Sequence, residues 1–290
     1  MLNTVFFDKK LNIENTPCIL LVGGFDGLHV GHKKLLARAQ AYGLPVGITT
    51  IVGCKTGSGL FTLEERRRIW EKAGFAFVCE MQFSQIKDTV WEDFARLLTD
   101  TYNVKAFVCG EDFRFGKGAE GTPKKLQAFT GVNVDVEDIL TWNGNKISTT
   151  TIKGYLTDGN VQKAGELLGD NFFLLGEVVR DRKVGRTLGF PTANIPYPQD
   201  KFALKKGVYE SQVTYQGKTY KGITNYGARP TFDNGQVCTE TYLDGFTGDL
   251  YGKTLQVEFV RFLRDIKAFE SADALKMQLT EDIRRVREND

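Results

Sequence analysis

A strand, a tight turn and a helix start follow one another near the beginning of this chain. The apolar run Cys18–Val22 has the length and composition of a buried strand, and Lys33–Tyr42 has helical spacing. The glycine-containing turn Gly23–His32 lies between them. Free N–H groups and the helix dipole favour an anion at a helix start, and glycine lets the backbone approach a phosphate closely. This segment therefore predicts a strand–turn–helix unit with an anion site.

The two histidines of the chain, His29 and His32, both lie in this turn. Each imidazole can donate a hydrogen bond to a phosphate oxygen, so the pair predicts a triphosphate ligand. The alternative interpretation is an ordinary strand-to-helix turn with two surface imidazoles. The strand before the turn and the helix after it favour the ligand site.

Short apolar runs alternate with helical segments through residues 1–155. The runs lie near Leu20 and at 46–51, 75–78 and 106–109, and the helical segments span 33–42, 62–73 and 91–102. Thr62, with Glu65 three residues later, predicts a capping box at one helix start. This alternation predicts an α/β, Rossmann-like domain with a parallel sheet covered on both faces. Ligands of such sheets bind beyond the carboxyl ends of the strands, where His29 and His32 fall.

The pattern changes after Gly169 to short alternating strands at 174–180, 207–215, 218–226, 238–243 and 254–262. Turns such as Gln216-Gly217 separate them, which predicts a small antiparallel β-barrel. A last helix is expected from Ser271, with its apolar residues Leu275, Leu279, Ile283 and Val286 packed on the barrel. We therefore expect two domains, residues 1–169 and 170–290.

The charge of the chain is balanced, with 38 Lys and Arg against 36 Asp and Glu. No basic stripe indicates a nucleic-acid partner, and no apolar run is long enough for a membrane span. Five scattered cysteines without a C-x-x-C pair argue against a disulfide framework or a zinc site. We expect a cytoplasmic protein, and the oligomeric state stays open. The run Arg66-Arg67-Arg68 is expected to form a solvated helix face with local ion pairs.

A second candidate site lies in the barrel half. Thr192 and Asn194 place two side-chain oxygens on one side of an extended segment, and Glu240 is a carboxylate in an uncharged strand. Phosphoryl transfer needs oxygen ligands for Mg²⁺ and a group that accepts the proton of the attacking hydroxyl. Alone, each of these features also fits an ordinary barrel turn or an outward-facing strand carboxylate.

Taken together, the segments Gly185–Asn194, Asn225–Phe232, Glu240–Asp244 and Phe262–Asp265 resemble the flavokinase module, in its order. The signature His29-Val30-Gly31-His32 resembles that of the adenylyl- and cytidylyltransferase superfamily. Because both modules occur in this order over nearly the whole chain, it is identified as a member of the prokaryotic bifunctional riboflavin kinase/FMN adenylyltransferase (FAD synthetase) family.

The resemblance implies two ATP-dependent reactions on small-molecule substrates. The C-terminal module would transfer the γ-phosphoryl group of Mg·ATP to riboflavin, giving FMN, with Glu240 as the base. Thr192 and Asn194 would hold Mg²⁺ and the phosphates. Gly185 and Arg186 would lie over the nucleotide, and Tyr242 and Arg264 would contact the flavin.

The N-terminal module would join FMN to the α-phosphate of a second ATP, releasing pyrophosphate and giving FAD. His29 and His32 would act there. The ATP-binding residues implied around them are Gly24, Phe25, Asp26, Gly31, Asp112, Ser148, Thr149 and Lys153.

Two motifs of the N-terminal half depart from the family pattern. The stretch Thr49–Cys54 stands where the family carries Thr-Phe-x-Pro-His-Pro, and Lys153 replaces an arginine that grips phosphate in two places. A riboflavin kinase with a degenerate N-terminal domain is therefore the alternative. A flavin-binding sensor is a third interpretation, and the presence of Thr192, Asn194 and Glu240 argues against it.

Overall fold

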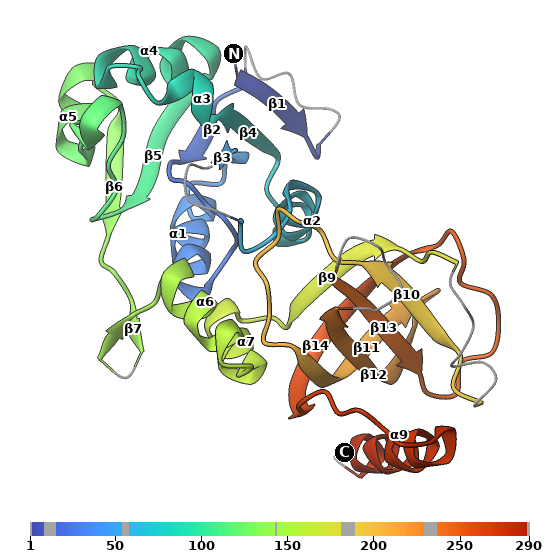
Figure 1. The fold of residues 1–290 in the computed structure, drawn as a ribbon. Helices are drawn as coiled ribbons and strands as arrows, with labels where there is room; N and C mark the ends of the chain where they lie inside the picture. Colours follow the sequence, from blue (N-terminus) through green and yellow to red (C-terminus); the bar gives the residue numbers. More distant parts are fainter. Residues whose placement is uncertain are drawn as a thin grey trace. The chain divides into compact units, whose positions relative to one another are not determined.

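Strand β2 (Cys18–Leu21) lies inside a six-stranded sheet in the computed structural model (Figure 1). The strand order is β1-β4-β3-β2-β5-β6. Five strands are parallel, and the edge strand β1 pairs antiparallel with β4. The parallel sheet expected from the sequence is thus a mixed one. The other strands are β1 (Leu2–Phe6), β3 (Val46–Val52), β4 (Phe77–Gln82), β5 (Val104–Gly110) and β6 (Asn133–Glu137).

The structure describes residues 2–8, 16–53, 58–142, 144–180, 189–228 and 237–288. Within these ranges, helices cover both faces of the N-terminal sheet. The helices are α1 (Val30–Gln40), α2 (Leu63–Ala73), α3 (Phe83–Ile86), α4 (Trp91–Thr101), α5 (Pro123–Thr130) and the short 3₁₀ helix η1 (Lys117–Ala119).

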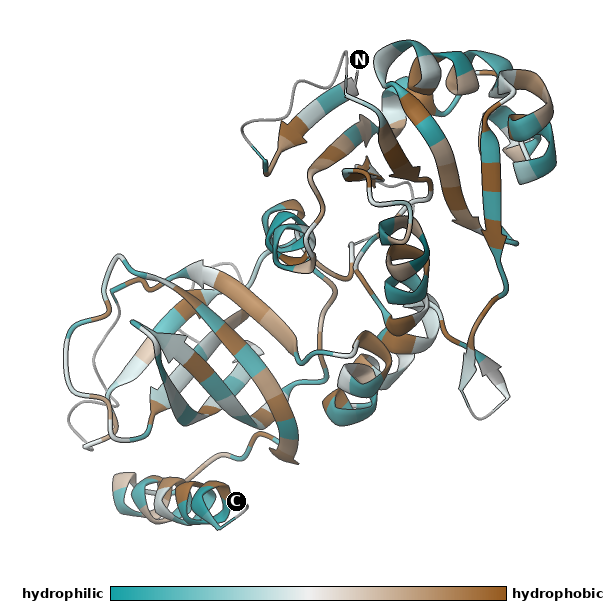
Figure 2. Ribbon diagram, turned by 180° about the vertical axis from the view of Figure 1, so that it is seen from behind, coloured by the Kyte–Doolittle hydropathy of each residue, from teal (hydrophilic) through white to brown (hydrophobic). Residues whose placement is uncertain are grey.

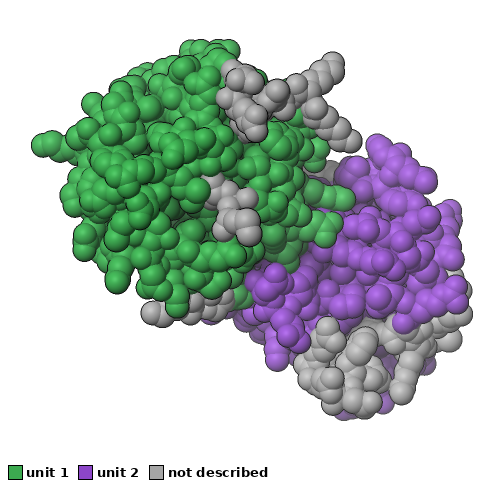
Figure 3. Space-filling view, turned by 90° about the horizontal axis from the view of Figure 1, so that it is seen from above, with its two compact units in different colours: residues 1–149 green, residues 150–290 purple. Residues whose placement is uncertain are grey.

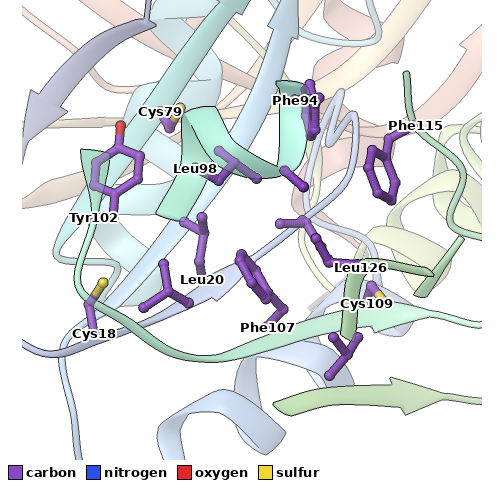
Figure 4. Packing of buried hydrophobic residues seen from close by; sticks show 14 of the residues in the cluster. Cys18, Leu20, Cys79, Phe94, Leu98, Tyr102, Phe107, Cys109, Phe115 and Leu126 are labelled. Atoms are coloured by element: carbon purple, nitrogen blue, oxygen red, sulfur yellow. The ribbon is translucent and has the colours of Figure 1, made fainter. Parts of the chain in front are cut away.

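Each face of this sheet has its own hydrophobic core. On one face, Phe94 and Leu98 of α4 pack with Leu20 and Phe107 of the sheet (Figure 4). On the other face, Leu36 of α1 and Trp70 of α2 pack against the same sheet. Fully burying a side chain of this size stabilises the fold by roughly 1.5–3 kcal/mol. The two cores therefore fix the sheet between its helices.

Helix α2 begins with the expected capping box. The Thr62 hydroxyl accepts the Glu65 N–H, and the Glu65 carboxylate accepts the Thr62 N–H. The expected solvated arginine face is only partly present on this helix. Arg68 is exposed and Arg67 pairs with Glu80, but Arg66 is buried, with 7% of its surface exposed. The prediction for Arg66 was wrong because this side chain points back toward the end of β3.

The chain divides into two compact units, Met1–Thr149 and Thr150–Asp290 (Figure 3). The short hairpin of β7 (Thr141–Trp142) and β8 (Asn145–Lys146) belongs to the first unit. Helices α6 (Thr149–Thr157) and α7 (Val161–Leu168) fall almost entirely in the second. The change of sequence pattern placed the expected division later, after residue 169.

The second unit contains a curled, six-stranded antiparallel sheet in the order β10-β13-β12-β11-β14-β9. An isolated bridge between Val179 and Asn194 draws its two edges together. Gln216 and Gly217, both with positive φ, form the turn between β11 and β12. The strands are β9 (Phe172–Glu177), β10 (Thr192–Pro196), β11 (Gly207–Tyr215), β12 (Lys218–Ala228), β13 (Val237–Leu243) and β14 (Thr254–Arg264).

Helix α9 (Ala272–Arg287) covers part of this sheet, and Ser271 caps its start as expected. Its Ile283 packs with Val208 and Ile223 of the sheet. Figure 2 shows apolar residues along the strands and a mixture of apolar and polar residues on α9. The helix is also held by an ion pair between Asp282, which is fully buried, and Arg264. Removing one partner of such a buried pair costs about 3–5 kcal/mol.

No helix among the described residues is long and apolar enough to cross a membrane. The four cysteines in those ranges, Cys18, Cys79, Cys109 and Cys238, are buried in the two units.

Candidate functional site

The turn Gly23–Leu28 leaves β2 where the strand order of the first sheet reverses. Strand β3 lies on one side of β2 and β5 on the other, so the segments that follow these three strands meet at one edge. Open α/β sheets bind ligands at such a switch point. Phe25 has a φ of 37°, a left-handed conformation that a bulky residue adopts only when its surroundings hold it there. The conformation of the turn is therefore maintained by the residues around it.

Two side chains, one from β3 and one from the turn itself, fix the course of the turn. The buried Thr49, in β3, accepts the Gly23 N–H at 2.9 Å and donates to the Gly23 carbonyl at 2.8 Å. The Asp26 carboxylate accepts the Leu60 N–H at 2.7 Å. The altered stretch beginning at Thr49 therefore still contacts the turn. Its last residue, Cys54, lies outside the described residues.

His29 is the N-cap of α1 and stacks on His32, with ring centroids 3.5 Å apart. A Cβ atom at Gly31 would lie 3.1 Å from the His29 ring, so glycine permits this close packing. Nδ1 of His29 accepts the His32 N–H, which leaves the proton of a neutral His29 on Nε2. Nδ1 of His32 lies 2.9 Å from the Gly27 carbonyl, which can only accept. We therefore assign the proton of a neutral His32 to Nδ1.

Both imidazoles are neutral at pH 7. Burial lowers the pKa of His29 to about 4, with a smaller contribution from the Lys146 charge and opposition from Asp112. Burial and the neighbouring His29 hold the pKa of His32 well below its usual value. In this state His29 can donate to a phosphate through Nε2–H, whereas Nε2 of His32 can donate only after the ring gains a proton. The two histidines, expected to act alike, thus differ in their hydrogen-bonding roles.

We expect the buried His29 to make the first unit less stable at acidic pH. An unfolded histidine titrates near pH 6.5 and the native His29 near 4, so between these values the unfolded state binds more protons and stability rises with pH. Lowering the pH from 7 to 5 should cost about 2 kcal/mol of unfolding free energy through His29. Urea unfolding of wild type and His29→Asn at both pH values measures this difference. Equal losses in the two proteins would contradict the assignment.

The remaining predicted residues of this half lie in later segments. Asp112 follows β5 and forms an ion pair with Lys146 of β8. Ser148 and Thr149 end the first unit at the start of α6. Lys153 lies in the second unit, with its ammonium nitrogen 5.2 Å from the centre of the Phe202 ring. Gly24, Phe25 and Asp26 thus lie in the turn, His29 caps α1, and Gly31 and His32 lie in the first turn of that helix. The Asp112 charge acts on His29 and opposes the lowering of its pKa.

The predicted kinase residues come together on adjacent strands. Asn194 of β10 lies opposite Glu240 of β13, and Thr192 lies opposite Tyr242 in the same ladder. Residues directly opposite in an antiparallel pair share a face and lie about 5 Å apart. Asn194 is buried, and its backbone carbonyl accepts the Val179 N–H across the closing bridge. Two residues separated by 46 positions in the chain are thus neighbours in space.

The two predicted flavin residues make different contacts. Tyr242 packs edge-on against Phe190, with ring centroids 5.4 Å apart. It lies opposite Thr192 and two residues after Glu240 on the same strand. Arg264 pairs in the sheet with Val208 of β11, and its own strand is the third one along the sheet from the strand that carries Glu240. Its guanidinium binds both oxygens of Asp282. Tyr242 thus lies beside Thr192 and also packs on the apolar cluster that contains Ile283 of α9, whereas Arg264 pairs with Asp282 of the same helix.

Both halves of the chain match known families. A family model for riboflavin kinase matches residues 168–289, and one for FAD synthetase matches residues 11–151. A bifunctional riboflavin kinase/FMN adenylyltransferase from Escherichia coli K12 is 34% identical over 298 residues, covering 96% of this chain and 95% of the relative. The chain belongs to the bifunctional riboflavin kinase/FMN adenylyltransferase family.

Other relatives extend this result. The family member of Haemophilus influenzae is 31% identical and covers 92% of both chains. A crystal structure of a Streptococcus pneumoniae protein described as a macrolide-efflux protein is similar over 95% of this chain and 96% of its own, with a TM-score of 0.84 and 29% identity. The similarity to this solved structure therefore extends over both units.

Sequence reasoning missed one residue of the flavokinase half. Asn225 of β12 lies opposite Glu240 on the side away from Asn194, so Asn194, Glu240 and Asn225 form one row across three strands. The segment Asn225–Phe232 was noticed as a family motif, but only strand register shows that its first residue adjoins Glu240. Gly185 and Arg186 lie outside the described residues.

Proposed function

We infer that the protein phosphorylates riboflavin to FMN and adenylylates FMN to FAD, consuming one ATP in each reaction. The observation that carries this inference is the placement of Glu240 beside Asn194 and Thr192 within the segment that matches the riboflavin kinase model. The segment with His29 and His32 lies within the part of the chain that matches the FAD synthetase model, and it supports the adenylylation of FMN. We keep residues 1–169 and 170–290 as the proposed functional division.

In the kinase reaction, Glu240 is the proposed base. Its carboxylate accepts the proton of the 5′-hydroxyl of riboflavin as that oxygen attacks the γ-phosphorus of ATP and ADP leaves. Tyr242 and Phe190 present an aromatic surface next to this carboxylate, which suits an isoalloxazine ring. Arg264 remains a proposed flavin contact through its position at the end of β14 beside α9.

Thr192 and Asn194 fit a Mg²⁺ site in the donor chemistry that they offer. Mg²⁺ is commonly held by one or two protein oxygens together with waters and substrate phosphates. A hydroxyl and an amide oxygen on one face of β10, beside the Glu240 carboxylate, supply such a partial set. Bound there, the ion would neutralise charge on the transferring phosphoryl group, while these residues orient the phosphates toward the flavin hydroxyl.

Asn194→Ala tests this assignment. Loss of one oxygen ligand should raise the Mg²⁺ concentration needed for half-maximal FMN formation by about tenfold. Riboflavin affinity, measured by quenching of flavin fluorescence, should stay within twofold of wild type. Asn194→Asp keeps an oxygen at this position and serves as the matched control. A parallel loss of riboflavin affinity would instead assign Asn194 to the flavin or to the fold.

In the adenylyl transfer, the protein needs no nucleophile. The phosphate of FMN attacks the α-phosphorus of ATP and pyrophosphate leaves, so the contribution of the protein is positioning and charge stabilisation. The start of α1, Nε2–H of His29 and the turn N–H groups face the developing negative charge in this proposal. Lys153 would supply a point charge where the family carries a planar guanidinium.

Product analysis separates the proposal from its alternative. Protein incubated with riboflavin, ATP and Mg²⁺ should give both FMN and FAD on chromatography. FMN without FAD would support the alternative, a kinase with a degenerate N-terminal domain. The match to the FAD synthetase model and the bifunctional relatives do not favour this alternative. The proposed location of both reactions is the cytoplasm, where ATP is plentiful.

A further inference from the structure

A buried hydrogen-bond network joins helix α2 to the turn that leads to His29 and His32. The Thr50 hydroxyl, at the end of β3, lies 3.1 Å from the Gly24 carbonyl oxygen and 3.2 Å from that of Phe25, and donates to them. The Ile51 N–H also donates to the Gly24 carbonyl, at 3.2 Å. Two successive carbonyls of the turn are thus directed at the end of β3.

Arg66 of α2 orients this hydroxyl from the other side. Its Nη1 donates to Thr50 Oγ1 at 3.0 Å and to the Ile51 carbonyl at 3.1 Å. A hydroxyl that accepts from a guanidinium must direct its own proton elsewhere, and the two turn carbonyls are the acceptors within reach. The bond from Arg66 is charge-assisted and both side chains are buried, so the arrangement is held firmly.

The direction of the carbonyls determines the direction of the neighbouring amides. In a trans peptide the C=O and the N–H of the same unit point in opposite directions. With the Gly24 and Phe25 carbonyls turned toward Thr50, the N–H groups of Phe25 and Asp26 point away from β3. Successive N–H groups with a common direction form an anion-binding concavity. The left-handed φ of Phe25 is the strained conformation that this network holds in place.

We propose that Thr50 and Arg66 are positioning residues for adenylyl transfer, which set the two turn N–H groups of Phe25 and Asp26 to bind the phosphates of ATP. The inference rests on the proposed FMN adenylyltransferase function. It also gives the altered stretch a role, because Thr50 stands where the family pattern carries an aromatic residue. A hydroxyl supported by Arg66 here holds the turn.

The test compares Thr50→Val, which removes the hydroxyl at nearly constant shape, with Arg66→Met. Each variant should lower kcat/KM for ATP in FAD formation by about ten- to a hundredfold, because a misplacement of about 1 Å at the reacting groups has an effect of this size. KM for FMN and all constants of the kinase reaction should stay within twofold. Because the two residues act through one bond, the double variant should lose no more than the worse single variant.

Three comparisons distinguish positioning from general stability. Thr50→Ser keeps the hydroxyl and should restore wild-type kinetics. Arg68→Met removes the same charge from an exposed position of the same helix and should change nothing. Hydrogen exchange should show the 22–28 peptide of free Thr50→Val exchanging about tenfold faster than wild type, with other peptides unchanged, because the turn has lost a restraint.

The outcomes separate this inference from the function on which it rests. Wild type that forms no FAD contradicts the proposed function. Wild type that forms FAD, with Thr50→Val and Arg66→Met at unchanged kcat/KM for ATP, overturns only the positioning role. The positioning role would also be overturned if KM for FMN rose and kinase activity fell in these variants as much as kcat/KM for ATP falls. That pattern would indicate a general defect of the fold.

Discussion

Replacing Glu240 by glutamine is expected to slow FMN formation by about two to four powers of ten, the range for loss of a general base. The amide keeps the shape and hydrogen-bonding capacity of the side chain but cannot take the proton of the attacking hydroxyl. Glu240 lies in the row Asn194–Glu240–Asn225, and the substitution keeps its size, so the proposed ligand Asn194 beside it should be undisturbed. Riboflavin affinity should therefore change little while kcat falls.

The measurement is the initial rate of FMN formation at saturating riboflavin, Mg²⁺ and ATP. Glu177→Gln is the matched control, because Glu177 is an exposed carboxylate on a strand of the same sheet. FAD formation from added FMN should be unaffected in both variants. A Glu240→Gln rate within a few-fold of wild type would remove this residue from the catalytic step and leave Thr192 and Asn194 as nucleotide ligands only.

The strands and helices with strong periodicity were predictable from the sequence. Strand Gly207–Tyr215 has the expected bounds, and Thr62 and Glu65 form the expected capping box. The strands that were missed are the short edge strands β1, β6 and β10 and the two-residue strands β7 and β8. Edge strands pair on one side only, so they carry polar residues and, in β10, a proline, which weakens the alternating pattern.

Local sequence spacing predicts less about the candidate sites than about the secondary structure. Local spacing placed His29 and His32 at a helix start, because that information lies within ten residues. The contact of Glu240 with Asn194 depends on strand register, which local spacing does not encode and which family resemblance only implied. Arg66 shows the same limit, since its place in an arginine run indicated solvent, and only the packing of α2 on the sheet turns this one guanidinium inward.

The tautomers of the two histidines are a further property that only the packing determines. A neutral imidazole has one donor and one acceptor, and the sequence does not show which nitrogen is engaged. The Gly27 carbonyl and the His32 N–H settle this by occupying Nδ1 of each ring. It follows that binding a triphosphate at Nε2 of His32 requires proton uptake, whereas binding at Nε2 of His29 does not.

Replacing both histidines by alanine is expected to abolish FAD formation and to leave FMN formation nearly unchanged. The double variant removes the Nε2–H donor of His29, the His32 ring on which His29 stacks and the cap of α1. In the proposed site the phosphates then lose their side-chain donor at the helix start. Loss of a donor to developing charge in a dry site costs about two to three powers of ten in rate, and loss of both rings should exceed this. Chromatography of the flavins formed from riboflavin and from added FMN measures the two reactions separately.

His29→Asn is the control that separates catalysis from folding. Asparagine is a good N-cap and should preserve the start of α1, but it lacks the imidazole Nε2–H that is proposed to donate to the phosphate. FAD formation should therefore remain strongly impaired in a variant with a wild-type melting temperature. If His29→Asn restored FAD formation, His29 would act as a helix cap and not as a phosphate ligand. If the double alanine variant also lost FMN formation, the two reactions would be coupled, and the histidine turn would contribute to the kinase as well as to adenylyl transfer.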